Sequence, residues 1–424
     1  MSSEDATNVE LVPRMAPDAA RDTHSAAVQQ KRLRRKAAAA PLVDPAVWTA
    51  CYPASSSVPL DQDGYAASFS PPQRLDGADC SPDASAFFAE HGYVVFSDVL
   101  TPAECTATVD ELWRVLEAET PGVKRDATES WGMLSAQTYG LVGKDVLFTP
   151  QVVRNRQNPR LVACFAALLG ADARPEAPQR DGLVVSTDRC CLFRPTQAGR
   201  TVGVDHPEWR TRENLHLDLH PWAFRDPEAV SRQAVEAMTY ASPRDFSKEN
   251  NWVNAETGPH IQAVLALANN AAEDGGTVIV PNFARAFDAW VDALGPVDLH
   301  TDAAASAARA AGDDTRPWLI SRDQGGGSFK FAPRDPLCAL ARRVPLRAGH
   351  LLVWDQRTAH GTHGNASDVP RYAQFIKAWR VTHASEERLQ RRAAAMLRHL
   401  RAAGVEQDIT ELGKRVFGLH WAPL

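Results

Sequence analysis

Leucines occupy every second position in the middle of the segment RENLHLDLHPW, residues 212–222, and His216 and Asp218 lie between them. Side chains alternate between the two faces of a β-strand. This spacing therefore predicts a strand with leucines buried on one face, and with an imidazole and a carboxylate side by side on the other. A buried carboxylate without a partner is costly, so a cation is expected close to that face. The segment predicts one part of a metal site.

Short apolar runs of β type dominate the chain from about residue 181. Polar loops separate them at irregular intervals, and strands do not alternate regularly with helices, which favours an antiparallel barrel or jelly roll over a parallel sheet. We expect a β core at about 181–382, with helical insertions at about 223–258 and 284–316. A helical segment precedes this core. A further helix with Ser385 as its N-cap follows it, so the predicted fold class is mainly β with flanking helices.

The first 45 residues contain few large apolar side chains and many Ala, Ser, Asp and Arg residues. Such a segment cannot bury enough surface to offset the entropy of ordering, so residues 1–45 are predicted to be a disordered tail. Residues 46–424 are predicted to form one domain. The basic run KRLRRK, residues 31–36, leaves nuclear import as an alternative to a cytoplasmic location.

Composition limits the classes of partner. The formal net charge of −6, without a basic stripe, argues against nucleic-acid binding. No apolar run approaches the roughly 20 residues of a membrane span, and the polar, acidic beginning of the chain is unlike a secretory signal. The seven cysteines contain no C-x-x-C pair and form a poor disulfide framework, so a reducing compartment is expected. The oligomeric state is not indicated.

Two protein ligands from one strand need a third from elsewhere. The segment GHLLVWDQRTAHGTHGNASDVPRYAQFIKAW, residues 349–379, offers His360 and His363 in a loop between two predicted strands. Two histidines and one carboxylate suit a non-haem Fe(II) oxygenase, because three further coordination positions stay open for a cosubstrate and O₂. His360 and His363 are alternative candidates for the third ligand. We expect His220 to be a core or rim residue, and His300 to be structural.

Five motifs, in order, resemble the phytanoyl-CoA dioxygenase-like family of Fe(II)/2-oxoglutarate oxygenases, from about residue 85 to the C-terminus. The resemblance implies a double-stranded β-helix (cupin-like) core. Two departures lie in turns, where His350 replaces a frequent Asp and Asn282 a frequent Gly, and they bear on loop shape and substrate class. The motifs are HGYVVFSDVL (91–100), HLDLHPW (216–222), EDGGTVIVP (273–281), HGTHGN (360–365) and TELGKRVFGLHW (410–421).

The resemblance implies that the iron ligands are His216, Asp218 and His360. It also implies that Arg371, eleven positions after His360, binds the distal carboxylate of 2-oxoglutarate. A guanidinium entering a partly desolvated barrel is well suited to a carboxylate, whereas the alternative is a surface ion pair with Asp368.

Two more residues are candidates for binding the cosubstrate. Thr362 matches the family's Ser/Thr two residues after the distal ligand, and Asn214 precedes His216 by two residues on the same strand face. The expected cofactors are Fe(II) and the cosubstrate 2-oxoglutarate, and ascorbate is a further candidate, as a reductant.

The expected function is a 2-oxoglutarate-dependent dioxygenase that hydroxylates a small organic molecule, with O₂ as the second substrate and succinate as a product. Asp218 argues against halogenation, because halide-using relatives need that coordination position vacated. Two alternatives stay open: a cupin-like metal-binding barrel without redox activity, such as an isomerase or hydrolase, and a non-catalytic scaffold of the same fold.

Overall fold

The computed structural model describes residues 43–134, 140–142, 148–225, 235–252, 260–321 and 327–422. The predicted disordered tail falls almost wholly outside these residues, as does the basic run 31–36, and both stay predictions. Within the described part, no helix combines the length and hydrophobicity that a bilayer span requires.

Two six-stranded antiparallel sheets form the centre of the described structure. We call the first the major sheet. Its long central strand β12 pairs with β5 on one side and β3 on the other, and the edge strands come from segments far apart in the sequence. In spatial order it contains β1 (Tyr93–Phe96), β10 (Leu351–Asp355), β5 (Ile261–Ala266), β12 (Arg371–Arg380), β3 (Leu183–Phe193) and β2 (Leu141–Val142).

The second sheet, the minor sheet, is built from shorter strands. Its central pair, β4 and β11, brings the predicted metal-binding segments next to each other, although they are more than 140 positions apart in the chain. In spatial order it contains β7 (Trp318–Ser321), β8 (Gly327–Lys330), β4 (Asn214–Leu217), β11 (His360–His363), β6 (Gly276–Ile279) and β9 (Arg342–Arg343).

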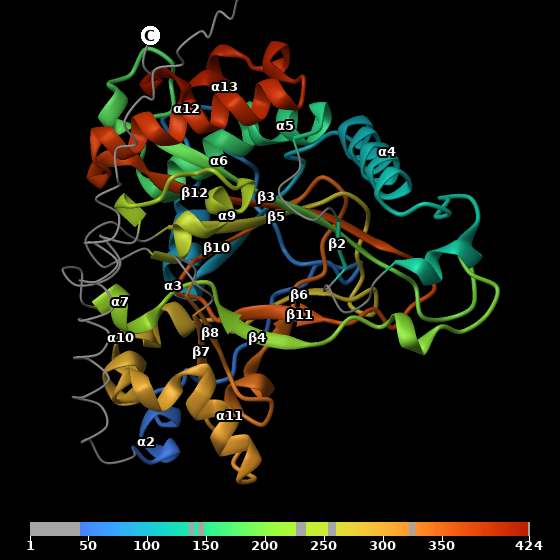
Figure 1. The fold of residues 1–424 in the computed structure, drawn as a ribbon, viewed down its shortest axis with the longest axis vertical. Helices are drawn as coiled ribbons and strands as arrows, with labels where there is room; N and C mark the ends of the chain where they lie inside the picture. The colour runs from blue at the N-terminus through green and yellow to red at the C-terminus, as the bar shows by residue number, and fades with distance from the viewer. Residues whose placement is uncertain are drawn as a thin grey trace, which may run out of the picture.

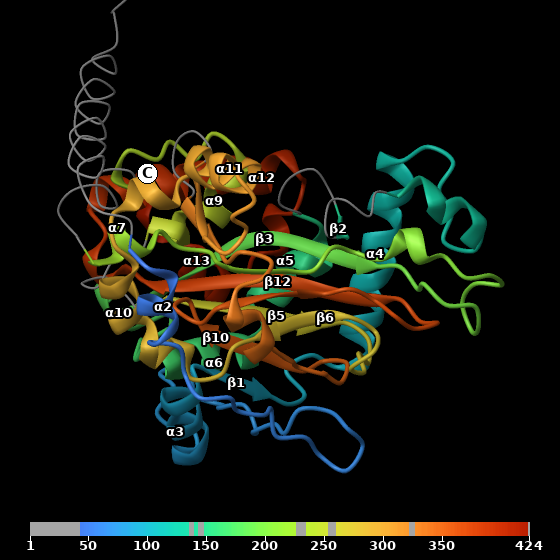
Figure 2. The same cartoon turned by 90° about the horizontal axis from the view of Figure 1, so that it is seen from below.

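Helices cover the outer faces of both sheets, as Figures 1 and 2 show. Over the major sheet lie α4 (Pro102–Glu119), α5 (Pro150–Arg156), α6 (Pro159–Leu169), α12 (Glu386–Ala402) and α13 (Glu411–Val416). Beside the minor sheet lie α2 (Pro45–Thr49), α10 (Phe283–Leu294) and α11 (Asp302–Ala310). The remaining α-helices described are α3 (Pro82–His91), α7 (Pro221–Arg225) and α9 (Pro243–Lys248), the last of which continues into the 3₁₀ helix η5 (Glu249–Trp252).

Local signals in the sequence explain where two of these helices begin. Thr101 caps α4 through a reciprocal capping box with Glu104, and Pro102 takes the first helical position, where its missing N–H costs nothing. Ser385 caps α12 by accepting a hydrogen bond from the backbone N–H of Arg388, as predicted. Both caps stabilise helices that pack over the major sheet.

The space between the two sheets holds apolar and polar side chains next to each other. An apolar cluster includes Phe193, Val264, Leu352 and Ile279, each at most 1% exposed, and Ile279 stands opposite His360 in the pairing of β6 and β11. Beside this cluster, Gln262 and Lys377 of the major sheet meet Asp218, which follows β4. Because an interior of this kind keeps polar groups only where they are paired or functional, this polar group is the natural place to look for a site.

The predicted fold class is confirmed: a mainly β jelly roll with flanking helices, helical insertions and C-terminal helices. The sequence pattern did not reveal the hairpin of β7 and β8. β1 is an edge strand of the major sheet, paired with β10, whereas β7 and β8 belong to the minor sheet.

Candidate metal centre

The alternation in residues 214–219 has the predicted consequence. Leu215, Leu217 and Leu219 are 6%, 0% and 0% exposed and pack in a cluster with aromatic residues of α10. His216 and Asp218 project from the opposite side, toward the major sheet, with side chains 20% and 25% exposed. The strand itself ends at Leu217, so Asp218 lies in the bend that follows rather than on the strand.

His360 completes the cluster. In the antiparallel pairing of β4 and β11 it stands directly opposite His216, and the two ring centroids are 4.4 Å apart. Asp218 Oδ1 lies 3.6 Å from His216 Nε2. One ligand atom from each of the three residues falls within 4.8 Å of the others. The structure thus brings together the three side chains that the sequence predicted to converge.

Asp218 is held by two residues of the major sheet. Lys377 Nζ lies 3.0 Å from Asp218 Oδ2, and Gln262 Nε2 donates to the same oxygen at 2.9 Å. Burial alone raises the pKa of Asp218, but the nearby charge of Lys377, together with the imidazoles, outweighs it and holds that pKa well below its ordinary value. The carboxylate is therefore anionic, with Oδ1 left facing the imidazoles.

The imidazole of His360 is oriented through its other nitrogen. Its Nδ1 lies 3.0 Å from the carbonyl oxygen of Thr358, a contact that requires the proton on Nδ1 and leaves the Nε2 lone pair for a metal. Burial lowers the pKa of His360 to about 3, with a further contribution from His216, and burial also lowers the pKa of His216. Two neutral imidazoles and one carboxylate fit a divalent transition metal.

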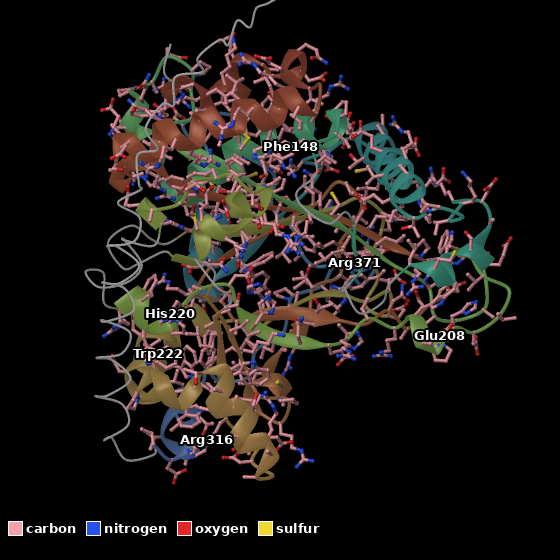
Figure 3. The ribbon with its side chains drawn as sticks, in the orientation of Figure 1. Phe148, Glu208, His220, Trp222, Arg316 and Arg371 are labelled. Carbon is pink, nitrogen blue, oxygen red and sulfur yellow. The ribbon has the colours of Figure 1, made fainter. Side chains whose placement is uncertain are left out.

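Arg371 begins β12 and lies in the space between the sheets, as Figure 3 shows. It is 3% exposed; its Nη1 lies 3.2 Å from Cys191 Sγ, its Nη2 lies 3.3 Å from Thr277 Oγ1, and its guanidinium stacks 4.7 Å from the Phe193 ring centroid. The described residues offer it no carboxylate. The surface ion pair with Asp368 is excluded, because Asp368 binds Arg200 instead.

Thr362 and Asn214 lie between Arg371 and the His–Asp–His cluster. The register places Thr362 opposite both Asn214 on β4 and Thr277 on β6. This row is two residues, roughly 6.5–7 Å, from the row that contains His360. The Oδ1 atom of Asn214 is buried and has no hydrogen-bond partner in the described structure. The row therefore offers polar groups between the cluster and the guanidinium.

The other histidines considered have structural settings. His363 Nε2 lies 3.4 Å from Glu213 Oε1 at a more exposed position, and of the two candidate histidines it is His360 that belongs to the described cluster. His220 Nδ1 accepts a hydrogen bond from the backbone N–H of Ala223 in α7, and Figure 3 shows it beside Trp222. His300 is buried, with Nε2 2.8 Å from the carbonyl oxygen of Leu294.

Residues of α9 and η5, in the predicted helical insertion at about 223–258, line the cluster, although the sequence did not identify the individual residues. Ser247 accepts from Lys377 Nζ through its carbonyl oxygen, and Asn251 Nδ2 lies 3.4 Å from Ser328 Oγ, which lies 3.4 Å from Asp218 Oδ1. Glu249, between them, is 1% exposed and binds Arg392 of α12 through both carboxylate oxygens. The helical insertion is therefore tied to the C-terminal helices by a buried ion pair.

Comparisons with known proteins bear on the family that the motifs resemble. No family model matches the chain. A curated protein of Dictyostelium discoideum named putative phytanoyl-CoA dioxygenase is 27% identical over 356 residues, covering 80% of this chain and 90% of the relative, which confirms the resemblance seen in the motifs.

Three solved structures are similar in shape at low sequence identity. GlcNAc Inducible Gene 2 of Candida albicans is 15% identical over 81% of this chain and 78% of that one, with a TM-score of 0.49. The non-heme alpha ketoglutarate dependent carbocyclase SnoK from nogalamycin biosynthesis is 18% identical over 73% and 87%, with a TM-score of 0.37. EctD from S. alaskensis, solved with 2-oxoglutarate and 5-hydroxyectoine, is 15% identical over 78% and 87%, with a TM-score of 0.38.

Proposed function

We propose that this chain, which resembles the phytanoyl-CoA dioxygenase family, is an Fe(II)/2-oxoglutarate-dependent dioxygenase that hydroxylates a small organic molecule. The observation that carries the proposal is the convergence of His216, Asp218 and His360 within 4.8 Å, in the same inter-sheet space as a buried arginine that no described carboxylate neutralises. Three protein donors leave half of an octahedral coordination sphere open for a chelating cosubstrate and O₂.

The chain's own residues supply position and charge. His216 Nε2, Asp218 Oδ1 and His360 Nε2 would hold the iron, which supplies the oxidative chemistry when bound. Arg371 would bind the distal carboxylate of 2-oxoglutarate, because a buried guanidinium gains most from an anion that replaces its lost water. Thr362 and Asn214 would hydrogen-bond the cosubstrate between its two ends, and so orient it before O₂ arrives.

The position of Arg371 separates this function from the alternatives. A cupin-like isomerase or hydrolase with the same three ligands has no use for a buried, unneutralised guanidinium in the same cavity. Leaving such a charge unpaired is costly, which favours an anionic ligand as part of the working site. A non-catalytic scaffold would not need His360 Nδ1 oriented by Thr358, because that contact serves to present Nε2.

The decisive experiment is a measurement of cosubstrate turnover. Purified protein is incubated with Fe(II), 2-oxoglutarate, ascorbate and O₂ together with fractionated metabolite extracts, and succinate release is followed. We expect succinate formation that requires both Fe(II) and 2-oxoglutarate and that rises with one or a few fractions. Succinate formation that persists in His216→Ala, or none with any fraction, would contradict the proposal. Cytoplasmic location stays part of the proposal.

A further inference from the structure

We infer that Lys377 is the counter-ion of Asp218 and sets the charge of the metal centre. By neutralising Asp218, the one carboxylate in the described cluster, it makes the centre bind a divalent metal less tightly, and a dianionic chelator on that metal more tightly, than a neutral side chain at position 377 would. The identity of the natural chelator rests on the proposed function, but the effect of the charge does not.

The ammonium group is fixed rather than mobile. The side chain of Lys377 is 7% exposed, and its Nζ lies 3.0 Å from Asp218 Oδ2 and 3.1 Å from the carbonyl oxygen of Ser247. Gln262 occupies the same carboxylate oxygen with a neutral donor, at 2.9 Å. Two donors on Oδ2 leave Oδ1, which lies 3.6 Å from His216 Nε2, as the oxygen that can ligate a metal.

The other charged groups near Lys377 do not cancel its charge. Asp188 Oδ2 is 4.0 Å from Nζ, but the carboxylate of Asp188 is bound by Arg189, whose Nε lies 3.1 Å from Oδ1. Lys330 stands opposite His216 in the pairing of β4 and β8, so it adds positive rather than negative charge to the same side. Asp218 is therefore the carboxylate that Lys377 pairs with most closely.

Simple electrostatics gives the sign of both effects. Without the metal, Asp218 and Lys377 form a pair with no net charge. A divalent cation that binds Oδ1 therefore meets a carboxylate whose negative charge is already compensated. It is also repelled by the Lys377 ammonium on the other oxygen of the same carboxylate, and both effects oppose binding. A dianion that then binds the metal is attracted by the same ammonium. Because the site is largely shielded from water, these interactions are weakly screened.

The test compares two affinities in the same set of variants. Calorimetry measures Co(II) binding to the metal-free protein, and then oxalate binding to the Co(II)-loaded protein; oxalate is a dianionic chelator too short to depend on Arg371. We expect Lys377→Gln and Lys377→Met to bind Co(II) about tenfold more tightly and oxalate about tenfold more weakly than the wild type. Lys377→Arg, which keeps the charge, should resemble the wild type in both.

A charge effect should change the Co(II) and oxalate affinities in opposite directions, whereas structural damage should change both in the same direction. Gln262→Met removes the neutral donor on the same oxygen and is the matched control, for which we expect any change to be in the same direction in both affinities. If both affinities fall together in the Lys377 variants, or neither moves, the inference is wrong while the proposed function stands. If the wild type binds neither Co(II) nor oxalate, the proposed function fails as well. Circular dichroism of each variant checks that it folds.

Discussion

The Nη2 atom of Arg371 lies 3.3 Å from the Oγ1 atom of Thr277, a contact that joins the major sheet to the minor sheet. Thr277 pairs with Thr362 of β11, and His360 is two positions from Thr362 on the same strand. The guanidinium is thus held at a fixed place relative to the His–Asp–His cluster.

Replacing Arg371 with Leu should weaken 2-oxoglutarate binding about 100-fold, because the carboxylate would enter a buried space without its partner. Co(II) binding should change less than threefold, since Arg371 touches none of the three metal-ligating residues. Anaerobic titration of the Co(II)-loaded protein with 2-oxoglutarate measures the effect. Arg200→Leu is the matched control, because Arg200 pairs with Asp368 at the surface. Equal losses in both variants would contradict the role given to Arg371.

Gly276→Ala should disturb Arg371 without touching the metal ligands. A Cβ at position 276 would lie 2.6 Å from Arg371 Nε and 3.0 Å from Arg343 Nη2, and the backbone there has φ +120°, which favours glycine. We expect a loss of about 1–3 kcal/mol in the free energy of unfolding and about tenfold weaker 2-oxoglutarate binding. Urea unfolding and the same titration measure these changes. Unchanged 2-oxoglutarate binding would show that the guanidinium tolerates displacement.

His360 and His363 should differ sharply in metal binding. His360→Ala removes one of three donors, and we expect Co(II) affinity to fall at least about 100-fold, whereas His363→Ala should leave it within about twofold. Calorimetry or the visible absorption of Co(II) measures both variants. The reverse order would mean that His363 rotates into the site when metal is present and that the geometry described above is not the metal-bound one.

The metal-free protein should lose stability as the pH falls from about 6.5 toward 4. Burial lowers the pKa of His360 from an ordinary 6.5 to about 3, so the unfolded chain takes up a proton before the folded one does. The stability contributed by the neutral imidazole is complete above pH 6.5 and decreases below it, by up to about 1.4 kcal/mol per pH unit. Urea unfolding in the presence of a chelator should show a shallower slope for His360→Gln. Parallel curves would exclude this contribution.

Glu249→Gln should unfold far more easily than a surface variant. Glu249 is bound through both oxygens by Arg392, and both side chains are at most 1% exposed, so removing one charge leaves the other buried and uncompensated. We expect a loss of about 3–5 kcal/mol. Glu411→Gln breaks the exposed pair with Lys414 and should cost at most about 1 kcal/mol. Denaturant unfolding compares the two, and a similar small loss in both would show that the buried pair is not stabilising the native fold.

The sequence predicted the parts of the site that have a local signature. Alternation around His216 and Asp218 identified the face on which they lie, and the spacing from His360 to Arg371 followed a known motif. The partners of Asp218 were not predictable in this way. Lys377 and Gln262 come from two other strands, and a lysine within an apolar strand looks the same in sequence whether its ammonium reaches solvent or a buried carboxylate.

Secondary-structure elements that depend on tertiary contacts were also not predictable from the sequence. β7 and β8 lie in a segment rich in glycine and polar residues, and they form a hairpin because β4 provides a partner edge, a tertiary effect that intrinsic β propensity does not encode. Glu249 was hidden for a related reason, since it lies in a polar insertion and its partner Arg392 is on a helix almost 150 residues later.

The three candidate metal ligands lie on adjacent strands of the minor sheet or in the bend beside them, whereas Arg371 belongs to the major sheet. The distance from the His–Asp–His cluster to the Arg371 guanidinium therefore depends on how closely the two sheets approach each other, and not on the geometry of either sheet alone. Substitutions that enlarge apolar side chains packed between the sheets, such as Leu352, would therefore alter recognition of the cosubstrate while the three candidate ligands keep their mutual spacing. Residues that bind no ligand themselves can thus adjust how long a cosubstrate must be to reach from the metal to the guanidinium.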